Sequence, residues 1–329
     1  MRQHTLHSVQ PSGAGFFLSG DVIQPLVRGE QTDGQSSLSR ITVLPGNGQM
    51  LHRHAQHETL FILDGEVQFQ GAKGGTIRNF AGGQGTLLHF PGCVPHSYFN
   101  ASPHPATLLS FTTPGGLENF YARAGQQVEC AADAAKLIPD NAHIESIGWE
   151  FGIEPIDPEL YDSREGYRAS GALFVPTAHG RSYLVLDSMV RILADATQTE
   201  GWLTVLEITQ RAGGEAPMHR HPAACTSYVL DGIFGFSGQS DEGRKILAAG
   251  TGTALHRSAG MSYGFRNNAP GSSRMLAFIT PAGIEDFVRA VGRELSSPDE
   301  YFRGDWPAPT SEELARVTAL ASQLGVEIH

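Results

Sequence analysis

Short apolar runs separated by turn residues fill most of the chain. Residues 39–46 (SRITVLPG) and 203–213 (LTVLEITQRAG) are rich in β-branched residues and end in residues typical of turns. Residues 58–71 and 226–238 each place two apolar runs around an Asp-Gly pair, a pattern that predicts a β-hairpin. Similar short runs predict further strands at 85–92, 107–112, 252–260 and 274–280.

The same segments occur twice at a constant distance. QTDG at 31–34 recurs as QTEG at 198–201, and TPGGLENFYARAG at 113–125 recurs as TPAGIEDFVRAVG at 280–292. In both pairs the second copy lies 167 residues after the first. A constant offset indicates a duplicated domain with almost no insertions. We therefore expect an all-β fold of two tandem barrels, in residues 1–160, which include a linker, and residues 161–329.

Helices are predicted only at the flanks of these barrels. Residues 117–125 and 284–292 carry apolar side chains on one side and end at a glycine, which predicts a short helix in each copy. A longer helix is predicted after Thr310, which forms a capping box with Glu313. Its apolar stripe, expected to pack on a barrel, consists of Leu314, Val317, Ala321 and Leu324.

Composition narrows the classes of partner. The formal net charge is −11, with 23 Lys and Arg against 34 Asp and Glu, so an acidic surface would repel nucleic acid. No basic run or long apolar stretch offers contact with a membrane. Three scattered cysteines and a start without an apolar core predict a cytoplasmic protein without a disulfide framework.

The stretch LHRHAQHETLFILDG at 51–65 concentrates side chains that bind metal ions. His52 and His54 are two residues apart, so in a strand they face the same side, and Glu58 has the same parity. His96 in VPHSYFN can supply a fourth ligand from another strand. Three imidazoles and one carboxylate leave positions open on one divalent transition metal ion per chain, such as Fe, Mn, Co, Ni or Cu.

An isolated His-x-His pair would more often be a surface or core feature than a metal site. His57, of opposite parity, is expected at the surface or behind the ligands. His89 recurs as His256 in the second copy, and simple packing accounts for it better than a role at the metal.

Two spaced motifs resemble those of the cupin superfamily, which are small β-barrels. The first family motif, G-x5-H-x-H-x3,4-E-x6-G, is met by Gly46, His52, His54, Glu58 and Gly65. The second, G-x5-P-x-G-x2-H-x3-N, is met by Gly85, Pro91, His96 and Asn100, with Cys93 where the family has glycine. The resemblance implies a bicupin with two tandem double-stranded β-helix (jelly-roll) barrels, and a metal bound in the first.

The second copy has lost this set of residues. Adding 167 to the ligand numbers gives His219, His221, Cys225 and Tyr263, which we interpret as a vestigial second site. A His2Cys metal site with a Cys225 thiolate is chemically feasible, but a buried structural cysteine is the commoner case.

The expected pocket around the first site is apolar. If the strands are regular, Met50, Leu60, Ile62 and Tyr98 share the inward face and would contact a substrate. Glu58 is the best candidate for acid–base catalysis, because a carboxylate at the metal can accept the proton of a substrate hydroxyl.

Among bicupins, the stretches HRHAQHE, VPHSY and TPGGLENFYARAG resemble bacterial quercetin 2,3-dioxygenases. That resemblance implies an oxidoreductase that cleaves a flavonol or another enol-bearing aromatic with O2. Glu58 follows His54 after three residues, where several quercetinases have four.

Two other classes remain open at this point. One is a non-oxidative cupin enzyme, an isomerase or decarboxylase; the other is a pirin-like binding or regulatory bicupin. The expected partners are a small aromatic molecule and O2, with no nucleic acid and no membrane. Edge strands of cupin barrels often pair between subunits, so a homodimer is one of the open oligomeric states.

Overall fold

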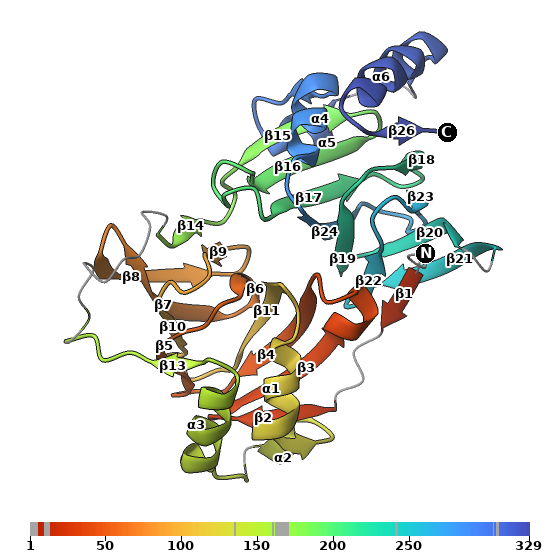
Figure 1. The fold of residues 1–329 in the computed structure, drawn as a ribbon. Coiled ribbons are helices and arrows are strands. Elements are labelled where there is room, and N and C mark those ends of the chain that lie inside the picture. Colours follow the sequence, from red (N-terminus) through yellow and green to blue (C-terminus); the bar gives the residue numbers. More distant parts are fainter. Residues whose placement is uncertain are drawn as a thin grey trace. The chain divides into compact units, whose positions relative to one another are not determined.

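The computed structural model describes residues 6–9, 14–134, 136–159, 161, 171–240, 243–304, 306 and 309–329. These residues form two compact units (Figure 1). We call residues 11–179 the N-terminal barrel, and residues 180–329 together with 1–10 the C-terminal barrel. The boundary expected at 160/161 falls beside residues 160 and 162–170, which lie outside the described residues. None of the helices in the described part of the chain is long and apolar enough to cross a bilayer.

The N-terminal barrel is built from an eight-stranded and a five-stranded antiparallel sheet. The order in the larger sheet is β12 (Gln126–Val128), β2 (Gly15–Leu18), β3 (Asp21–Val27), β4 (Ser37–Val43), β11 (Ala106–Thr113), β6 (His57–Asp64), β9 (Leu87–Phe90) and β14 (Leu173–Val175). The order in the smaller sheet is β13 (Glu154–Pro155), β5 (Gly48–Arg53), β10 (His96–Phe99), β7 (Glu66–Lys73) and β8 (Thr76–Gly83).

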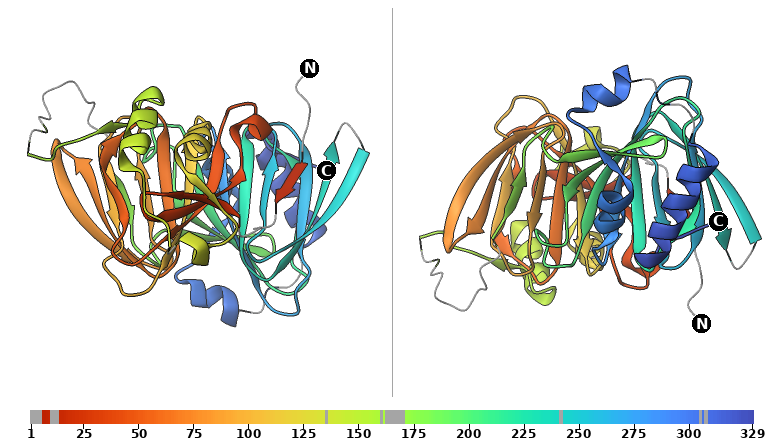
Figure 2. Two further views of the ribbon diagram at one scale, coloured as in Figure 1. Left: turned by 90° about the horizontal axis from the view of Figure 1, so that it is seen from below. Right: turned by 90° about the horizontal axis from the view of Figure 1, so that it is seen from above.

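The C-terminal barrel repeats this pair of sheets. Its eight-stranded sheet runs β1 (Leu6–Val9), β22 (Ala254–Arg257), β19 (Ala224–Asp231), β24 (Ser273–Thr280), β17 (Thr204–Gln210), β16 (Ser188–Ala194), β15 (Arg181–Val185) and β25 (Arg293–Glu294). Its five-stranded sheet runs β21 (Gly243–Gly250), β20 (Ile233–Ser240), β23 (Ser262–Asn267), β18 (Glu215–Arg220) and β26 (Glu327–Ile328). In each unit one long hairpin, β7–β8 or β20–β21, forms an edge of the smaller sheet (Figure 2).

The strands predicted around the two Asp-Gly pairs are confirmed, but the predicted hairpins are wrong. β6 and β7 are consecutive, yet β6 pairs with β9 and β11 whereas β7 pairs with β8 and β10. The chain therefore changes sheets at Gly65, whose φ of 82° is in the left-handed region that glycine tolerates best. β19 and β20 change sheets in the same way at Gly232, with φ 83°.

Short helices flank the barrels as predicted. α1 (Leu117–Ala124) and α4 (Ile284–Val291) occupy matching places, and each holds a buried glutamate, Glu118 or Glu285. Each glutamate accepts one backbone N–H at the start of its helix and a second one from a segment 89 residues earlier. The remaining helices are α2 (Ala131–Ala134), α3 (Asn141–Glu150), α5 (Pro298–Arg303), α6 (Ser311–Gln323) and the 3-10 turn η1 (Gly29–Thr32). α3 lies against α1 in the N-terminal barrel (Figure 1).

The capping box of the last helix is confirmed. Thr310 Oγ1 accepts the N–H of Glu313, and Glu313 accepts the N–H of Thr310. Val317 and Ala321 are buried as expected. Leu314 and Leu324 of the predicted stripe are exposed instead, because the helix covers its unit along a narrower line than its sequence pattern suggests.

The turn that contains Cys93 keeps the geometry that glycine gives in the second copy. Cys93 has φ 65°, and its counterpart Gly260 has φ 75°. In both turns the backbone N–H donates to a histidine carbonyl, that of His54 at 2.7 Å and that of His221 at 2.9 Å. The cysteine is accommodated at a cost in backbone strain, and the turn still supports His54.

Candidate metal centre

Three imidazoles converge inside the N-terminal barrel. His52 lies on β5, His54 follows that strand directly, and His96 begins β10, where it pairs with His52. One ring nitrogen from each lies within 4.8 Å of the others, close enough for all three to bind one ion. Among the described residues this is the single cluster of three or more such groups.

Backbone carbonyls orient two of the rings. His52 Nδ1 lies 2.8 Å from the carbonyl of Met50, and His96 Nδ1 lies 2.8 Å from the carbonyl of Val94. Each Nδ1 must donate to its carbonyl, so in the neutral ring Nε2 is left with a lone pair. Second contacts of this kind fix the tautomer of metal-ligating histidines in proteins.

Glu58, on β6, lies beside two of the imidazoles. Its Oε2 is 3.0 Å from His96 Nε2 and 3.5 Å from His54 Nε2. Its Oε1 accepts a hydrogen bond of 2.5 Å from Ser110 Oγ on β11. All of these side chains except His52 are buried. Burial raises the pKa of the Glu58 carboxyl, but the adjoining imidazoles of His54 and His96 hold that pKa well below its usual range.

These contacts fit a bound cation. His96 Nε2 and Glu58 Oε2 are both hydrogen-bond acceptors once Nδ1 has donated to Val94, and two acceptors 3.0 Å apart need a proton or a positive ion. Both ring nitrogens of His54 are buried without a hydrogen-bond partner. Burial, with the charges of His96 and His54, lowers the pKa of His52 to about 3, so its ring is neutral and available as a ligand.

A cavity of about 360 Å³ opens on the cluster. The residues that line it are Leu18, Ser19, Ile41, Gly48, Gln49, Met50, Leu51, His52, His54, Glu58, Tyr98, Leu117, Phe120, Tyr121, Asn141, Ile144, Glu145, Gly148, Ile153 and Pro155. Its character is apolar with a few polar groups, and no Lys or Arg is among these residues. Small-molecule sites in proteins have this character.

The four residues expected to contact a substrate divide into two groups. Met50 and Tyr98 line the cavity, although the side chain of Met50 is 81% exposed. Leu60 and Ile62 are fully buried in the core of the barrel and do not line this cavity. They lie further along β6 than Glu58, where the interior is filled by side chains.

Sequence reasoning missed a second polar pair at the cavity. Tyr98 donates a hydrogen bond of 2.8 Å to Asp21, which lies on β3 and is completely buried. Burial raises the pKa of Asp21 to about 7, although hydrogen bonds from Tyr98 and Gln49 act to lower it. The charged residue at position 21, at the start of a strand that is otherwise apolar apart from Gln24, was the available signal.

Tyr121 of α1 was also missed. It is buried, lines the cavity, and its pKa is raised well above the usual value by burial and by the charges of Glu58 and Glu118. In the second copy the counterparts of Tyr98, Ser110 and Tyr121 are Phe265, Ala277 and Val288, so the polar surroundings are specific to the first site.

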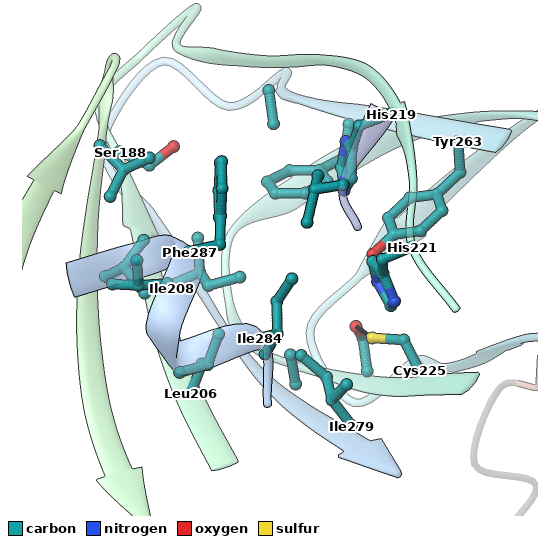
Figure 3. A pocket seen from close by; sticks show the side chains of 18 of the residues that line it. Ser188, Leu206, Ile208, His219, His221, Cys225, Tyr263, Ile279, Ile284 and Phe287 are labelled. Carbon is teal, nitrogen blue, oxygen red and sulfur yellow. Dashed lines mark hydrogen bonds between the residues drawn. The ribbon is translucent and has the colours of Figure 1, made fainter. Parts of the chain in front are cut away.

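The counterparts of the four proposed ligands also lie together in the C-terminal barrel. Figure 3 shows His219, His221, Cys225 and Tyr263 along one side of a pocket, across from Leu206, Ile208 and Phe287. His221 Nε2 and the hydroxyl of Tyr263 are hydrogen-bonded at 3.0 Å, and the counterparts of these two residues in the other barrel are His54 and His96. Burial is the main cause that lowers the pKa of His219 to about 4 and that of His221 to about 3.

A comparison with protein families finds a match within the N-terminal barrel. Residues 39–112 match the family model described as Cupin domain. The match includes His52, His54, Glu58 and His96. A search of curated proteins by sequence found no match.

Solved structures with tandem cupin barrels resemble both halves. Oxalate decarboxylase from Lactobacillus farciminis, in a formate complex, is 14% identical with a TM-score of 0.58, over 84% of this chain and 86% of that chain. Procruciferin, the 11S globulin of Brassica napus, is 14% identical over 84% and 85%, with a TM-score of 0.56. Vicilin of Corylus avellana is 15% identical over 84% and 85%, with a TM-score of 0.57.

At this level of identity the comparison establishes the fold alone. It confirms the predicted fold class, an all-β chain of two tandem cupin barrels with short flanking helices. These comparisons do not test the resemblance to quercetin 2,3-dioxygenases.

Proposed function

We propose that the N-terminal barrel is a metal-dependent dioxygenase centre for a small aromatic substrate with an enol hydroxyl, such as a flavonol. His52, His54, Glu58 and His96 would hold one divalent transition metal ion. The observation that supports this most strongly is the pair of acceptors, His96 Nε2 and Glu58 Oε2, which lie 3.0 Å apart, with Glu58 lining the cavity together with His52 and His54. Only a cation or a proton makes that contact favourable.

When bound, a divalent ion would supply a Lewis acid and a redox centre, with one net positive charge left after pairing with Glu58. An enolate substrate matches that charge. Among the described residues that line the cavity there is no Lys or Arg that would select a dianion. Leu117, Phe120 and Ile144 provide an apolar surface against which an aromatic ring would pack.

Glu58 is placed to take a proton from the substrate hydroxyl. Its pKa is held low, so it is a carboxylate at neutral pH and can act as a base. Ser110 holds Oε1 and leaves Oε2 directed at the imidazoles. We propose that Tyr98, fixed by Asp21, orients the polar end of the substrate in the same cavity.

The test begins with elemental analysis of protein purified without added metal, followed by oxygen-electrode measurements with flavonols and other enols. We expect close to one equivalent of a transition metal per chain and oxygen uptake that His52→Ala abolishes. No uptake by metal-loaded protein across a broad panel would overturn the dioxygenase. Metal well below one equivalent, even after loading, would indicate a binding or regulatory protein instead.

A decarboxylase is the second candidate, since several structures similar in fold are oxalate decarboxylases. Release of CO2 from a small carboxylate, measured with metal-loaded protein, would favour it over the dioxygenase. The lack of a cation in the described lining of the cavity argues against a dicarboxylate such as oxalate.

A further inference from the structure

A buried arginine takes a place in the C-terminal barrel that is apolar in the N-terminal one. Arg257, on β22, corresponds to Phe90, and it is 2% exposed. In the N-terminal barrel the ring of Phe90 stacks on His96. In the C-terminal barrel the guanidinium lies 4.4 Å from the ring of Tyr263, the counterpart of His96.

The guanidinium is held by one of its three nitrogens. Nη2 donates to Cys225 Sγ at 2.8 Å and also to Ser227 Oγ. Nε and Nη1 are buried and have no hydrogen-bond partner. Burial lowers the pKa of Arg257, but Cys225 and Tyr263 outweigh burial and raise that pKa, so the group stays charged.

Two nitrogens of the Arg257 guanidinium therefore lack a hydrogen-bond acceptor. No carboxylate lies within ion-pair distance of Arg257 in the part of the chain that the structure describes. A buried cation with free N–H groups is costly unless an acceptor, ideally an anion, satisfies them. Guanidinium groups match carboxylates especially well in both charge and geometry.

Arg257 lines a cavity of about 110 Å³ inside this barrel, the pocket drawn in Figure 3. Leu206, Ile208, Ile284 and Phe287 are among the apolar side chains of its wall. The imidazoles of His219 and His221 also line it, and their lowered pKa values keep them neutral. Glu215, the acidic residue of the lining, is exposed.

We propose that the C-terminal barrel binds a small monocarboxylate with an apolar chain, whose carboxylate pairs with the guanidinium of Arg257. The size of the cavity limits the ligand, because an apolar cavity of about 150 Å³, larger than this one, holds a molecule the size of benzene. Short-chain fatty acids fit this limit. The guanidinium gives the second barrel a permanent cation near the place where the first barrel would hold an exchangeable one, and it would also repel a divalent ion there.

The experiment is isothermal titration of the full-length protein with propionate, butyrate and valerate, at constant ionic strength. Butyramide has nearly the shape of butyrate without its charge, and chloride tests for a simple anion site. We expect saturable binding of at least one carboxylate, about tenfold or more tighter than butyramide, as a charge-assisted hydrogen bond implies. Chloride should not displace it at equal concentration.

Two variants test separately the charge of Arg257 and the volume of the cavity. Arg257→Met removes the cation with little change in volume and should weaken carboxylate binding about tenfold or more. Ala277→Leu keeps Arg257 and fills the cavity, because Ala277 is buried in its wall, and should abolish binding. Arg220→Met, a change at a half-exposed arginine of the same barrel, is the matched control and should bind as the wild type does.

Several results would overturn the proposal. These are no binding by any of the three carboxylates, equal binding of butyramide and butyrate, displacement by equal chloride, or unchanged binding in Arg257→Met. If Arg257→Met failed to fold, unchanged binding in Ala277→Leu would overturn it as well. His52→Ala should leave carboxylate binding intact, so the result is independent of the metal centre in the N-terminal barrel.

Discussion

The two barrels share a backbone and differ in what they place at its centre. Around His96 the N-terminal barrel gathers a carboxylate, a serine and two tyrosines. Around Tyr263, its counterpart, the C-terminal barrel gathers a thiol, a guanidinium and apolar side chains. The residues that build the turns are kept in both: Asn100 and Asn267 each donate to backbone carbonyls that close the same loop. Structure is thus conserved between the halves where backbone is held, and chemistry diverges where side chains meet the cavity.

The largest effect that would test this contrast is loss of the metal. His96→Ala removes a proposed ligand, so it should lower oxygen uptake and metal affinity, and with the affinity the metal content. The loss should exceed the roughly 100-fold cost of removing a residue that only orients a metal ligand. Tyr263→Ala, the matched change in the C-terminal barrel, should leave metal content at the wild-type level, measured by elemental analysis of both proteins. Equal loss of metal in both variants would show that the halves do not differ in this way.

Asp21 should make the stability of the N-terminal barrel depend on pH, which its counterpart Ser188 cannot do in the C-terminal barrel. Its pKa is 3.8 when free and about 7 in the fold, so between these values the folded state retains a proton that the unfolded chain releases. The free energy of unfolding should therefore fall as pH rises from about 4 to 7, by up to about 4 kcal/mol, and then level off.

Asp21→Asn removes that proton and should flatten the decline. Urea unfolding of chelator-treated protein at about pH 5 and pH 7.5 should show the variant gaining about 3 kcal/mol on the wild type between the two conditions. Ser188→Ala should change stability equally at both. A constant difference between Asp21→Asn and wild type would contradict the prediction.

Ser110 offers a smaller test at the same site. Ser110→Ala removes the donor to Glu58 Oε1, and we expect a loss of about tenfold in activity or metal affinity, as for other outer partners. Substrate oxidation and a metal-competition titration would measure the two. Ala277→Ser introduces the hydroxyl in the other barrel, where Cys225 takes the place of Glu58, and should change neither. Wild-type activity and affinity in Ser110→Ala would show that the hydroxyl does not position Glu58.

The smallest expected effect concerns the turn at Cys93. Cys93→Gly relieves a left-handed backbone and should raise the stability by up to about 1 kcal/mol, partly offset by the entropy of glycine. Gly260→Ala introduces the same strain in the second barrel and should lower it by about 1 kcal/mol. Thermal unfolding of both variants would measure this. A destabilised Cys93→Gly would mean that packing of the thiol outweighs the strain.

Much of this organisation was predictable from the residues alone. The offset of 167 identified the repeat, and strand parity brought His52 and His54 together, because both signals depend on local backbone geometry. Sheet membership was not predictable in the same way. The Asp-Gly pair at 64–65 is compatible with a hairpin and with a corner between sheets, and only the pairing of β11 with β6 decides between them.

The surroundings of the site depended on distant segments and escaped prediction for that reason. Asp21 meets Tyr98 across 77 positions, and Leu60 and Ile62 share the parity of Glu58 but lie in filled space. The unusual position of Arg257 could have been predicted from the sequence, because its counterpart at the offset of 167 is the apolar residue Phe90. The repeat therefore carries information about function where its two copies disagree.

One strand has a consequence for how the protein is made. β1 is synthesised long before its partner in the sheet, β22, so Leu6 pairs with Arg257 only after that arginine has been synthesised. Until then β1 has no sheet to join, and without it β22 would leave an open edge beside Arg257. Cutting the chain between its halves would therefore not yield two intact modules. Removal of residues 1–10 should expose an unpaired, aggregation-prone strand edge in the C-terminal barrel.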